Sequence, residues 1–236
     1  MKRILKGALV RLTARVFQHR VLARLPQDEL SVVALTSRGL LRFLPDPALL
    51  QDTAVLAPDP IRYATMALAI HRIRTQQIAG SFAEVGVWRG DTSKRIHDFA
   101  PERTLYLFDT FAGFPGAGDA QDHRFRDTSV ERVAQTIGTL NNIIIRAGCF
   151  PESVQGLERE QFAFVMLDLD KYAATLAGLT FFYPRLAGGG YIFVHDYNSP
   201  ESGWAVSQAV DHFLADKPEY VVELPDKFGS IIIRKL

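Results

Sequence analysis

Five short apolar runs, separated by segments long enough for crossover helices, constrain the fold of this chain more than any other feature. The runs are rich in β-branched and aromatic residues, as buried strands of a parallel sheet are. They span Phe82–Val87, Thr104–Phe108, Asn142–Arg146, Phe162–Leu167 and Tyr191–Val194. The alternation predicts an α/β fold with a doubly wound, mostly parallel, Rossmann-like sheet.

Two further runs complete a predicted seven-stranded sheet. Glu219–Leu224 and Gly229–Arg234 are joined by four residues, a length that suits an antiparallel hairpin rather than a crossover. The sheet is therefore expected to end in an antiparallel C-terminal strand. Helices are expected at Tyr63–Gln77 (ending at Gly80), Tyr172–Tyr183 and Gly203–Leu214, and Gly188-Gly189-Gly190 is expected to form the turn into the fifth strand.

The N-terminal region differs in composition from the rest of the chain. Residues 1–24 carry seven basic and no acidic side chains, and their apolar residues recur at helical spacing. We expect residues 1–60 to form a basic helical arm and linker, and residues 61–236 to form the main domain. The basic helix could make peripheral contact with an anionic membrane, or it could pack on its own domain or on a second subunit of a homo-oligomer.

Composition limits the partners and the compartment. The formal net charge of +1 gives no general affinity for polyanions, so nucleic acid is not expected as a partner. The single cysteine, Cys149, excludes an intramolecular disulfide and fits a reducing compartment. No stretch approaches the roughly 20 apolar residues that span a bilayer. We expect a cytoplasmic protein, with membrane association through residues 1–24 left open.

Acidic residues follow the fourth and fifth runs. Asp168 and Asp170 come after Phe162–Leu167, and the pair His195-Asp196 comes after Tyr191–Val194. If these strands are neighbours, three carboxylates and an imidazole converge at one edge of the sheet. Burying such a group is costly unless a cation, a proton or a substrate compensates the charge. A hard divalent metal such as Mg²⁺ would fit.

The first two runs end in residues that suit a nucleotide-like ligand. Gly86 and Gly90 punctuate the turn after the first run, and Asp109, at the end of the second, is placed to hold a ribose. Trp88 stands where a dinucleotide fingerprint needs a glycine, whereas Glu84 two residues before Gly86 matches the turn that binds S-adenosylmethionine (SAM). Asp109 would serve a nicotinamide cofactor equally well, or could simply cap a turn.

Six strings along the chain carry a family resemblance. They are Gln76–Gly90, Leu107–Pro115, Gly148–Ser153, Asp168–Tyr172, Tyr183–Gly190 and His195–Tyr197. In this order and spacing they resemble the macrocin O-methyltransferase family of class I SAM-dependent methyltransferases. The resemblance runs from about Arg62 to the C-terminus and does not cover residues 1–60.

The resemblance implies a metal-assisted enzyme that methylates hydroxyl groups of small-molecule acceptors such as sugars and other natural-product scaffolds. The SAM-binding residues would lie in or after the first four runs. Glu84, Gly86 and Gly90 would line the pocket, and Asp109 would hold the ribose. Gly148 and Phe150 would lie beside the adenine, and Asp168 would also contact the cofactor. The metal ligands would be Asp168 and Asp196, with Asp170 and His195 close behind.

Two positions depart from the family pattern. His195 stands where the family commonly has a second acid, and imidazole suits Mn²⁺, Fe²⁺ or Zn²⁺ better than Mg²⁺. Lys171 replaces an apolar or neutral residue beside the acids. His195, Lys171 and Asp170 are the candidates for catalytic proton transfer, although carboxylate neighbours would raise the pKa of His195 and weaken it as a base. Lys171 could instead only neutralise the acids.

Two other classes of function remain open, together with one role for a loop. An NAD-dependent sugar-modifying enzyme is disfavoured by Trp88, and a noncatalytic protein recruited through residues 1–24 is disfavoured by the acids at both strand ends.

The polar segment 116–128 could close over bound ligands, with His123, Arg124 and Arg126 facing the acceptor, or could be an ordinary solvated loop.

Overall fold

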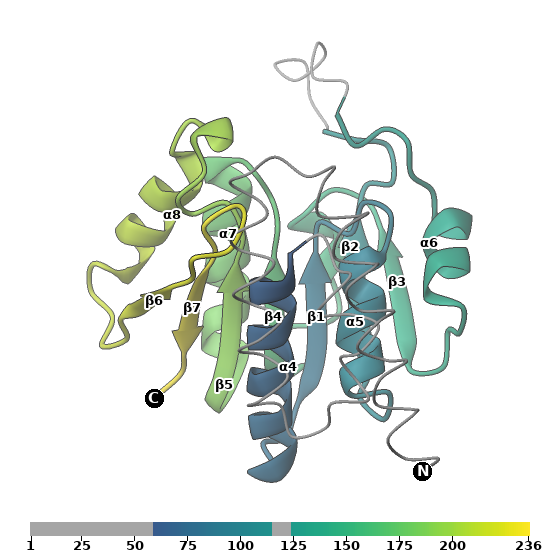
Figure 1. The fold of residues 1–236 in the computed structure, drawn as a ribbon, viewed down its shortest axis with the longest axis horizontal. Coiled ribbons are helices and arrows are strands. Elements are labelled where there is room, and N and C mark those ends of the chain that lie inside the picture. The colour runs from purple at the N-terminus through teal and green to yellow at the C-terminus, as the bar shows by residue number, and fades with distance from the viewer. Residues whose placement is uncertain (1–58, 115–123) are drawn as a thin grey trace, which may run out of the picture.

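The computed structural model describes residues 59–114 and 124–236 (Figure 1). Within these residues, seven strands form one sheet in the order β3-β2-β1-β4-β5-β7-β6. The strands are β1 (Ser81–Val85), β2 (Leu105–Asp109), β3 (Ile143–Ala147), β4 (Phe162–Leu167), β5 (Leu186–Val194), β6 (Val221–Glu223) and β7 (Ile231–Arg234). The first five pair in parallel, and β7 is antiparallel to both β5 and β6. The predicted mostly parallel sheet with its antiparallel end is confirmed.

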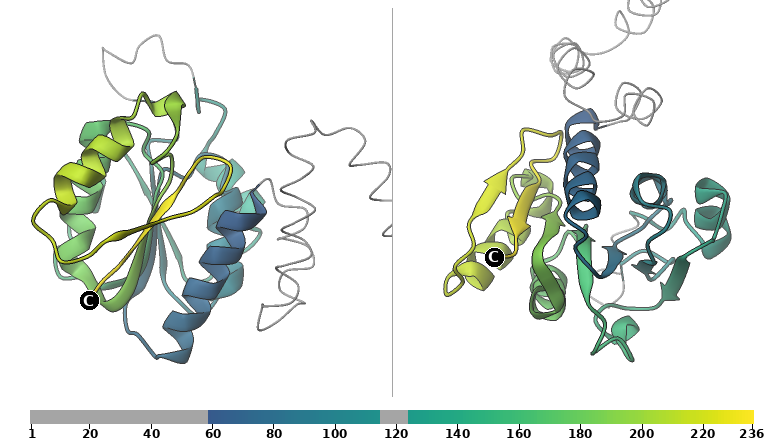
Figure 2. Two further views of the ribbon diagram at one scale, coloured as in Figure 1. Left: turned by 60° about the vertical axis from the view of Figure 1, so that its left-hand side comes forward. Right: turned by 90° about the horizontal axis from the view of Figure 1, so that it is seen from below.

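Helices cover both faces of the sheet, as Figure 2 shows. One face carries α4 (Pro60–Thr75), α5 (Asp91–Phe99) and α6 (Val130–Ile137), and the other carries α7 (Tyr172–Phe182) and α8 (Ala205–Leu214). Short 3-10 turns lie at Glu152–Val154, Tyr183–Arg185 and Pro200–Ser202. Because helices cover both faces, every residue of β4 is buried. Among the described residues, no helix is long and apolar enough to cross a membrane.

The strand order reverses at the carboxyl ends of β1 and β4, which are called the crevice below. From β1 the chain moves outward to β2 and β3, and it then returns to the other side of β1 to form β4. Such a reversal leaves the carboxyl ends of the two central strands open to a ligand. The backbone here is tight: Gly86 has φ +88°, and a Cβ atom on it would lie 1.8 Å from the carbonyl oxygen of Asp168. Only glycine fits this position.

Helix α4 begins and ends earlier than the sequence pattern predicts. The side chain of Asp59 caps it by accepting a hydrogen bond from the Arg62 N–H (3.3 Å). The helix ends at Thr75, because Gln77 takes a left-handed conformation with φ +54°. Gly80, expected at the helix end, instead precedes β1, where a Cβ atom would lie 2.8 Å from the Phe162 carbonyl carbon.

The expectation that Gly188-Gly189-Gly190 forms a turn is wrong. The three glycines lie inside β5. Leu186 pairs with Phe162 of β4 and Tyr191 pairs with Phe164, so β5 advances five residues where β4 advances two. This bulge needs residues without side chains, since a Cβ atom on Gly190 would lie 2.9 Å from the Ala163 carbonyl oxygen.

Several expectations fall outside the described residues. The basic helix of residues 1–24, the linker that follows it up to residue 58, and His123 in the segment 115–123 are among them. Membrane contact and self-association through the N-terminal arm therefore stay predictions.

We predict that Gly86→Ala destabilises the fold by about 3 kcal/mol or more, because it adds a steric clash to the cost of a left-handed alanine. Gly138→Ala is the matched control: φ is +84° there, but a Cβ atom would meet nothing within 4 Å. It should cost only about 1–2 kcal/mol. Urea unfolding of both variants measures the difference, and equal losses would contradict the close approach of β1 to β4.

Candidate active site

The acids after β4 and β5 meet at the carboxyl edge of the sheet. Parallel pairing of Leu167 with Val194 brings the two strand ends into register, and the His195 N–H donates to the Leu167 carbonyl (2.9 Å). One ligand atom from each of Asp168, His195 and Asp196 lies within 4.8 Å of the others. The predicted convergence of these three residues is therefore observed.

His195 stands at the centre of this acidic cluster. Its Nδ1 atom lies 3.1 Å from Asp168 Oδ1 and 2.9 Å from Asp196 Oδ2. The ring is only 7% exposed, and neither ring nitrogen has a partner with hydrogen-bond geometry. Although burial opposes its charge, the two carboxylates raise the pKa of His195 to about 10. The imidazolium therefore offsets part of the acidic charge at neutral pH.

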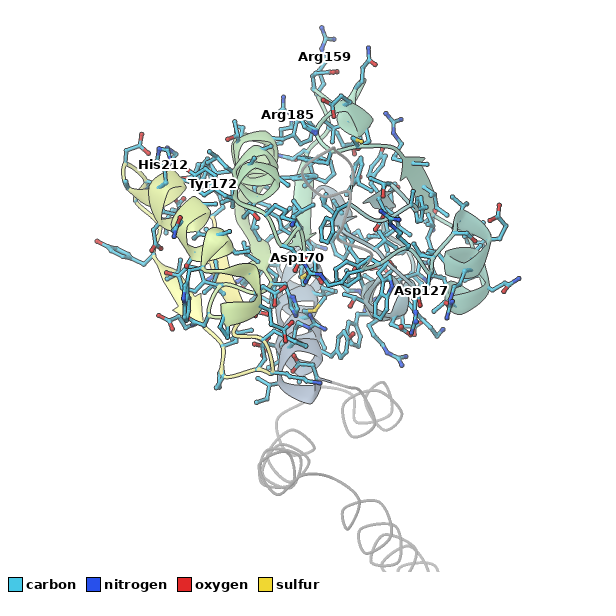
Figure 3. The ribbon with its side chains drawn as sticks, turned by 90° about the horizontal axis from the view of Figure 1, so that it is seen from above. Asp127, Arg159, Asp170, Tyr172, Arg185 and His212 are labelled. Carbon is cyan, nitrogen blue, oxygen red and sulfur yellow. The ribbon has the colours of Figure 1, made fainter. Side chains whose placement is uncertain are left out.

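The pKa values of Asp168 and Asp170 are shifted in opposite directions. Burial works against the charge on Asp168, but His195 outweighs it and lowers the pKa of this carboxyl below its ordinary value. Asp170 lies beside the cluster with φ +57°, near the middle of the carboxyl edge in Figure 3. Burial, reinforced by Asp168 and Asp196, raises the pKa of Asp170 to about 7.

The ligand atoms of the cluster have the spacing of a divalent metal site. Adjacent ligands of an octahedral ion bound at about 2.1 Å lie about 3 Å apart. The two contacts of His195 Nδ1, at 3.1 and 2.9 Å, match this value. His195 Nδ1 meets both carboxylates without hydrogen-bond geometry, and this is the further observation that favours an ion, since buried polar atoms normally have a well-directed partner. Asp168, His195 and Asp196 could hold such an ion, and Asp170 is not part of this three-residue group.

The sequence analysis missed two residues near the cluster: Phe228, which packs against it, and Arg62, whose charge acts on it. Arg62 lies in the first turn of α4 and is 7% exposed. In the sequence it is only a basic residue near the start of a helix, so no pattern distinguishes it. Phe228, in the loop between β6 and β7, packs its ring 5.0 Å from the His195 ring. Phe228 also lines a cavity of about 690 Å³ between this loop and the segment after β5.

Asp109 is fully engaged with the backbone of the neighbouring turns. Its Oδ2 atom accepts hydrogen bonds from the N–H groups of Val87 (2.7 Å) and Trp88 (2.9 Å), and its Oδ1 atom accepts one from Phe111 (2.7 Å). Asp109 therefore holds the turn after β1 against the end of β2. Its predicted role at a ribose stays a prediction.

Glu84 points into the protein instead of into the crevice. It is 1% exposed, and Ser93 of α5 donates a hydrogen bond to its carboxyl group. Burial raises the pKa of Glu84 well above its ordinary value, although the Ser93 hydroxyl opposes the shift. Glu84 thus connects β1 to α5, and its predicted place in a cofactor pocket is not tested by these contacts.

The remaining predicted cofactor residues lie along the same edge. Gly148 donates its N–H to the Asp109 carbonyl (2.9 Å), which joins the ends of β2 and β3. Gly90 caps α5 with φ +83°. The Phe150 ring stacks on Phe182 of α7, with the centroids 6.0 Å apart and the planes 14° apart. Their proposed contacts with SAM stay predictions.

Lys171 and the described end of the polar loop lie around a group of aromatic rings. The Lys171 ammonium lies 4.6 Å from the centre of the Phe114 ring, and the Arg124 guanidinium lies 5.3 Å from it. The loop is fixed to the first turn of the site, because Trp88 Nε1 donates to Asp127 (2.8 Å). Figure 3 shows Asp127 and Asp170 on the same carboxyl edge.

Comparison with known proteins adds independent evidence. The family model described as Macrocin-O-methyltransferase (TylF) matches residues 60–219. Mycinamicin III 3''-O-methyltransferase from Micromonospora griseorubida is 28% identical over 164 residues, which cover 59% of this chain and 64% of that protein. Demethyldecarbamoylnovobiocin O-methyltransferase from Streptomyces niveus is 29% identical over 141 residues, 51% of this chain and 53% of that protein. The chain thus matches less than two thirds of the length of these curated relatives.

A solved structure has the same fold. The O-methyltransferase NovP superposes with a TM-score of 0.63 at 22% sequence identity, over 75% of this chain and 80% of that chain. At this identity the similarity supports the fold alone.

The buried carboxyl of Glu84 predicts a pH dependence of stability. A carboxyl with a raised pKa in the folded state stabilises the protein fully below its unfolded-state pKa near 4.5 and loses this contribution as the pH rises toward the folded-state value. Glu84→Gln removes the titration. We therefore expect the stability of wild type relative to Glu84→Gln to decrease from pH 5 to pH 8 in urea unfolding. Parallel pH profiles would contradict the raised pKa.

Proposed function

Because the chain belongs to the macrocin O-methyltransferase family, we propose that it is a SAM-dependent O-methyltransferase assisted by a divalent metal. The proposed acceptor is a hydroxyl group of a sugar or a natural-product-like small molecule. The observation that carries the proposal is the meeting of Asp168, His195 and Asp196 beside the crevice of the family-matched sheet. The names of both relatives, which describe O-methylation of mycinamicin III and of demethyldecarbamoylnovobiocin, support the acceptor class.

Asp168, His195 and Asp196 are the proposed metal ligands. Their mixed set of carboxylate and imidazole favours Mn²⁺, Fe²⁺ or Zn²⁺ over Mg²⁺, although Mg²⁺ suits the two carboxylates. When bound, the ion would orient the acceptor hydroxyl and lower its pKa. His195 is assigned as a ligand rather than a base because its Nδ1 atom already faces both carboxylates at about the distance between neighbouring ligands. It would bind the ion as a neutral imidazole, so metal binding would release the proton that the carboxylates favour in the metal-free protein.

SAM, when bound, supplies a methyl group on a positively charged sulfur. The acceptor oxygen would take this methyl group, and the electron pair of the broken carbon–sulfur bond would stay on the sulfur. Asp170, beside the three ligands, is proposed to accept the hydroxyl proton. Lys171, beside Phe114, is proposed to offset the acidic charge instead of taking the proton. Gly86 is proposed to lie in the cofactor pocket, where its missing side chain makes room for the Asp168 carbonyl.

The cavity of about 690 Å³ is the proposed entry for the acceptor. It is lined by polar side chains that can hydrogen-bond hydroxyl groups, including Asn198, Glu201, Glu223 and Asp226. Phe228 lines the same cavity and packs on His195, so it connects the cavity to the proposed metal ligands. A polyhydroxylated acceptor could therefore reach the site from this side.

Ligand binding tests the cofactor assignment directly. We expect calorimetric titration to show micromolar binding of SAM or S-adenosylhomocysteine and no binding of NAD. NAD binding without SAM binding would favour a sugar-modifying oxidoreductase, and binding of neither cofactor would favour a noncatalytic protein of this fold. Either result would overturn the proposed activity.

The metal ligands are tested without knowledge of the acceptor. We expect Asp196→Asn to weaken Mn²⁺ binding, measured by electron paramagnetic resonance, by at least about 10-fold, because it removes one of the two charged ligands. The affinity for S-adenosylhomocysteine should change by less than about threefold. The matched control is Asp211→Asn, an exposed carboxylate of α8 that accepts a hydrogen bond from Tyr197 (2.7 Å). If Asp196→Asn binds Mn²⁺ as the wild type does, these residues do not form the metal site.

A further inference from the structure

Arg62 is a buried cation that the described part of the protein pairs only loosely. Its side chain extends from the first turn of α4, and the residue is 7% exposed. Among the described residues, its one ion pair is a loose contact of 3.8 Å between Nε and Asp59 Oδ2. Neither Nε nor Nη1 has a hydrogen-bond partner. These two buried N–H donor groups could still bind an acceptor from a ligand.

Burial opposes the charge of Arg62, and nearby carboxylates offset this cost without giving Nε or Nη1 a hydrogen bond. Removing a charged group from water costs several kcal/mol unless good hydrogen bonds replace its hydration. The guanidinium is also stacked against the ring of Tyr63, 5.1 Å from its centre, which fixes its position without satisfying its donors. A planar anion such as a carboxylate would accept hydrogen bonds from it in pairs.

The position of Arg62 indicates which kind of ligand could supply that anion, because it places the guanidinium near the predicted cofactor site. Tyr63 bonds to Thr92 Oγ1 (3.0 Å), which fixes the start of α4 against the first turn of α5. Asp59, which Arg62 contacts, also accepts a hydrogen bond from the N–H group of Lys227 (3.3 Å), and the next residue, Phe228, packs on His195. The guanidinium therefore lies between the start of α5 and the acidic cluster, where its charge also acts on Glu84 and Asp168. This is the crevice at which the strand order reverses.

The proposed cofactor would present its charged end to this crevice. With the ribose at the end of β2 and the adenine at the end of β3, the strand order leaves the ends of β1 and β4 for the amino-acid portion. That portion carries an α-carboxylate. The methyl group lies between the amino-acid portion and the ribose, on the side of Asp168.

We propose that Arg62 binds the α-carboxylate of SAM and thereby orients the methyl group toward the acidic cluster. The inference rests on the proposed function, because it requires SAM in the crevice. It assigns to α4, which precedes the first strand, a direct part in cofactor recognition. It also explains why a cation is buried at a place where the ligand-free protein gives it no hydrogen bonds.

Decarboxylated SAM provides the decisive comparison, because it differs from SAM only in lacking the carboxylate. We expect Arg62→Met to weaken SAM binding in calorimetry by on the order of 10- to 100-fold, the range of one charge-assisted interaction. Its affinity for decarboxylated SAM should change by less than about threefold. Arg62→Lys keeps the charge without the planar group and should lose less SAM affinity than Arg62→Met.

Matched controls separate binding from folding. Arg72→Met makes the same substitution on the exposed end of α4 and should leave both affinities unchanged. Urea unfolding of Arg62→Met and Arg72→Met without ligand measures the stability of each variant, so that a loss of ligand affinity can be distinguished from a loss of folding. The inference would be overturned if Arg62→Met lost affinity for SAM and for decarboxylated SAM equally, or if its affinity for SAM were unchanged. The cofactor assignment would stand in either case. If wild type binds neither ligand, the cofactor assignment itself fails, and the inference with it.

Discussion

The carboxylates of Asp168, Asp170 and Asp196 are held together at one edge of the sheet, and the surrounding structure has to compensate their charge. Backbone pairing of β4 with β5 fixes the strand ends, so the acids cannot separate without breaking the sheet. His195 supplies a cation within the cluster, and Arg62 supplies a second one from the opposite side of the crevice. The electrostatics of the site thus follow from the order of the strands.

The two sides of the crevice are fixed by different kinds of contact. On the β1 side, backbone N–H groups of the first turn converge on Asp109, and the buried pair of Glu84 with Ser93 joins β1 to α5. On the β4 side, the carboxylates face His195 and the packing depends on Phe228 from the C-terminal hairpin. The first side therefore has a rigid, satisfied backbone, whereas the second keeps unpartnered polar atoms. This asymmetry suits a cofactor held on one side and a metal and an acceptor on the other.

Much of this arrangement could be predicted from sequence, because it depends on strand ends. Apolar runs locate the parallel strands, and residues that directly follow them must lie on a common edge. The meeting of Asp168, His195 and Asp196 follows from that rule once β4 and β5 are neighbours. The three glycines before Tyr191 were misassigned, because a bulge and a turn both require glycine and only pairing with β4 distinguishes them. Arg62 could not be identified, since it lies in the first turn of a helix that the motifs do not include.

The sequence by itself determined the order of the strands and helices, the seven-stranded sheet with its antiparallel end, and the placement of acids at the ends of β4 and β5. These features depend on periodicity and on residues adjacent in the chain. Only the tertiary structure decided that Asp109 and Glu84 are occupied by the protein's own groups, that His195 bridges two carboxylates, and that Arg62 and Phe228 border the cluster. The physical reason is that these contacts join residues far apart in the chain, and side-chain direction, burial and charge compensation are fixed only when the helices pack on the sheet.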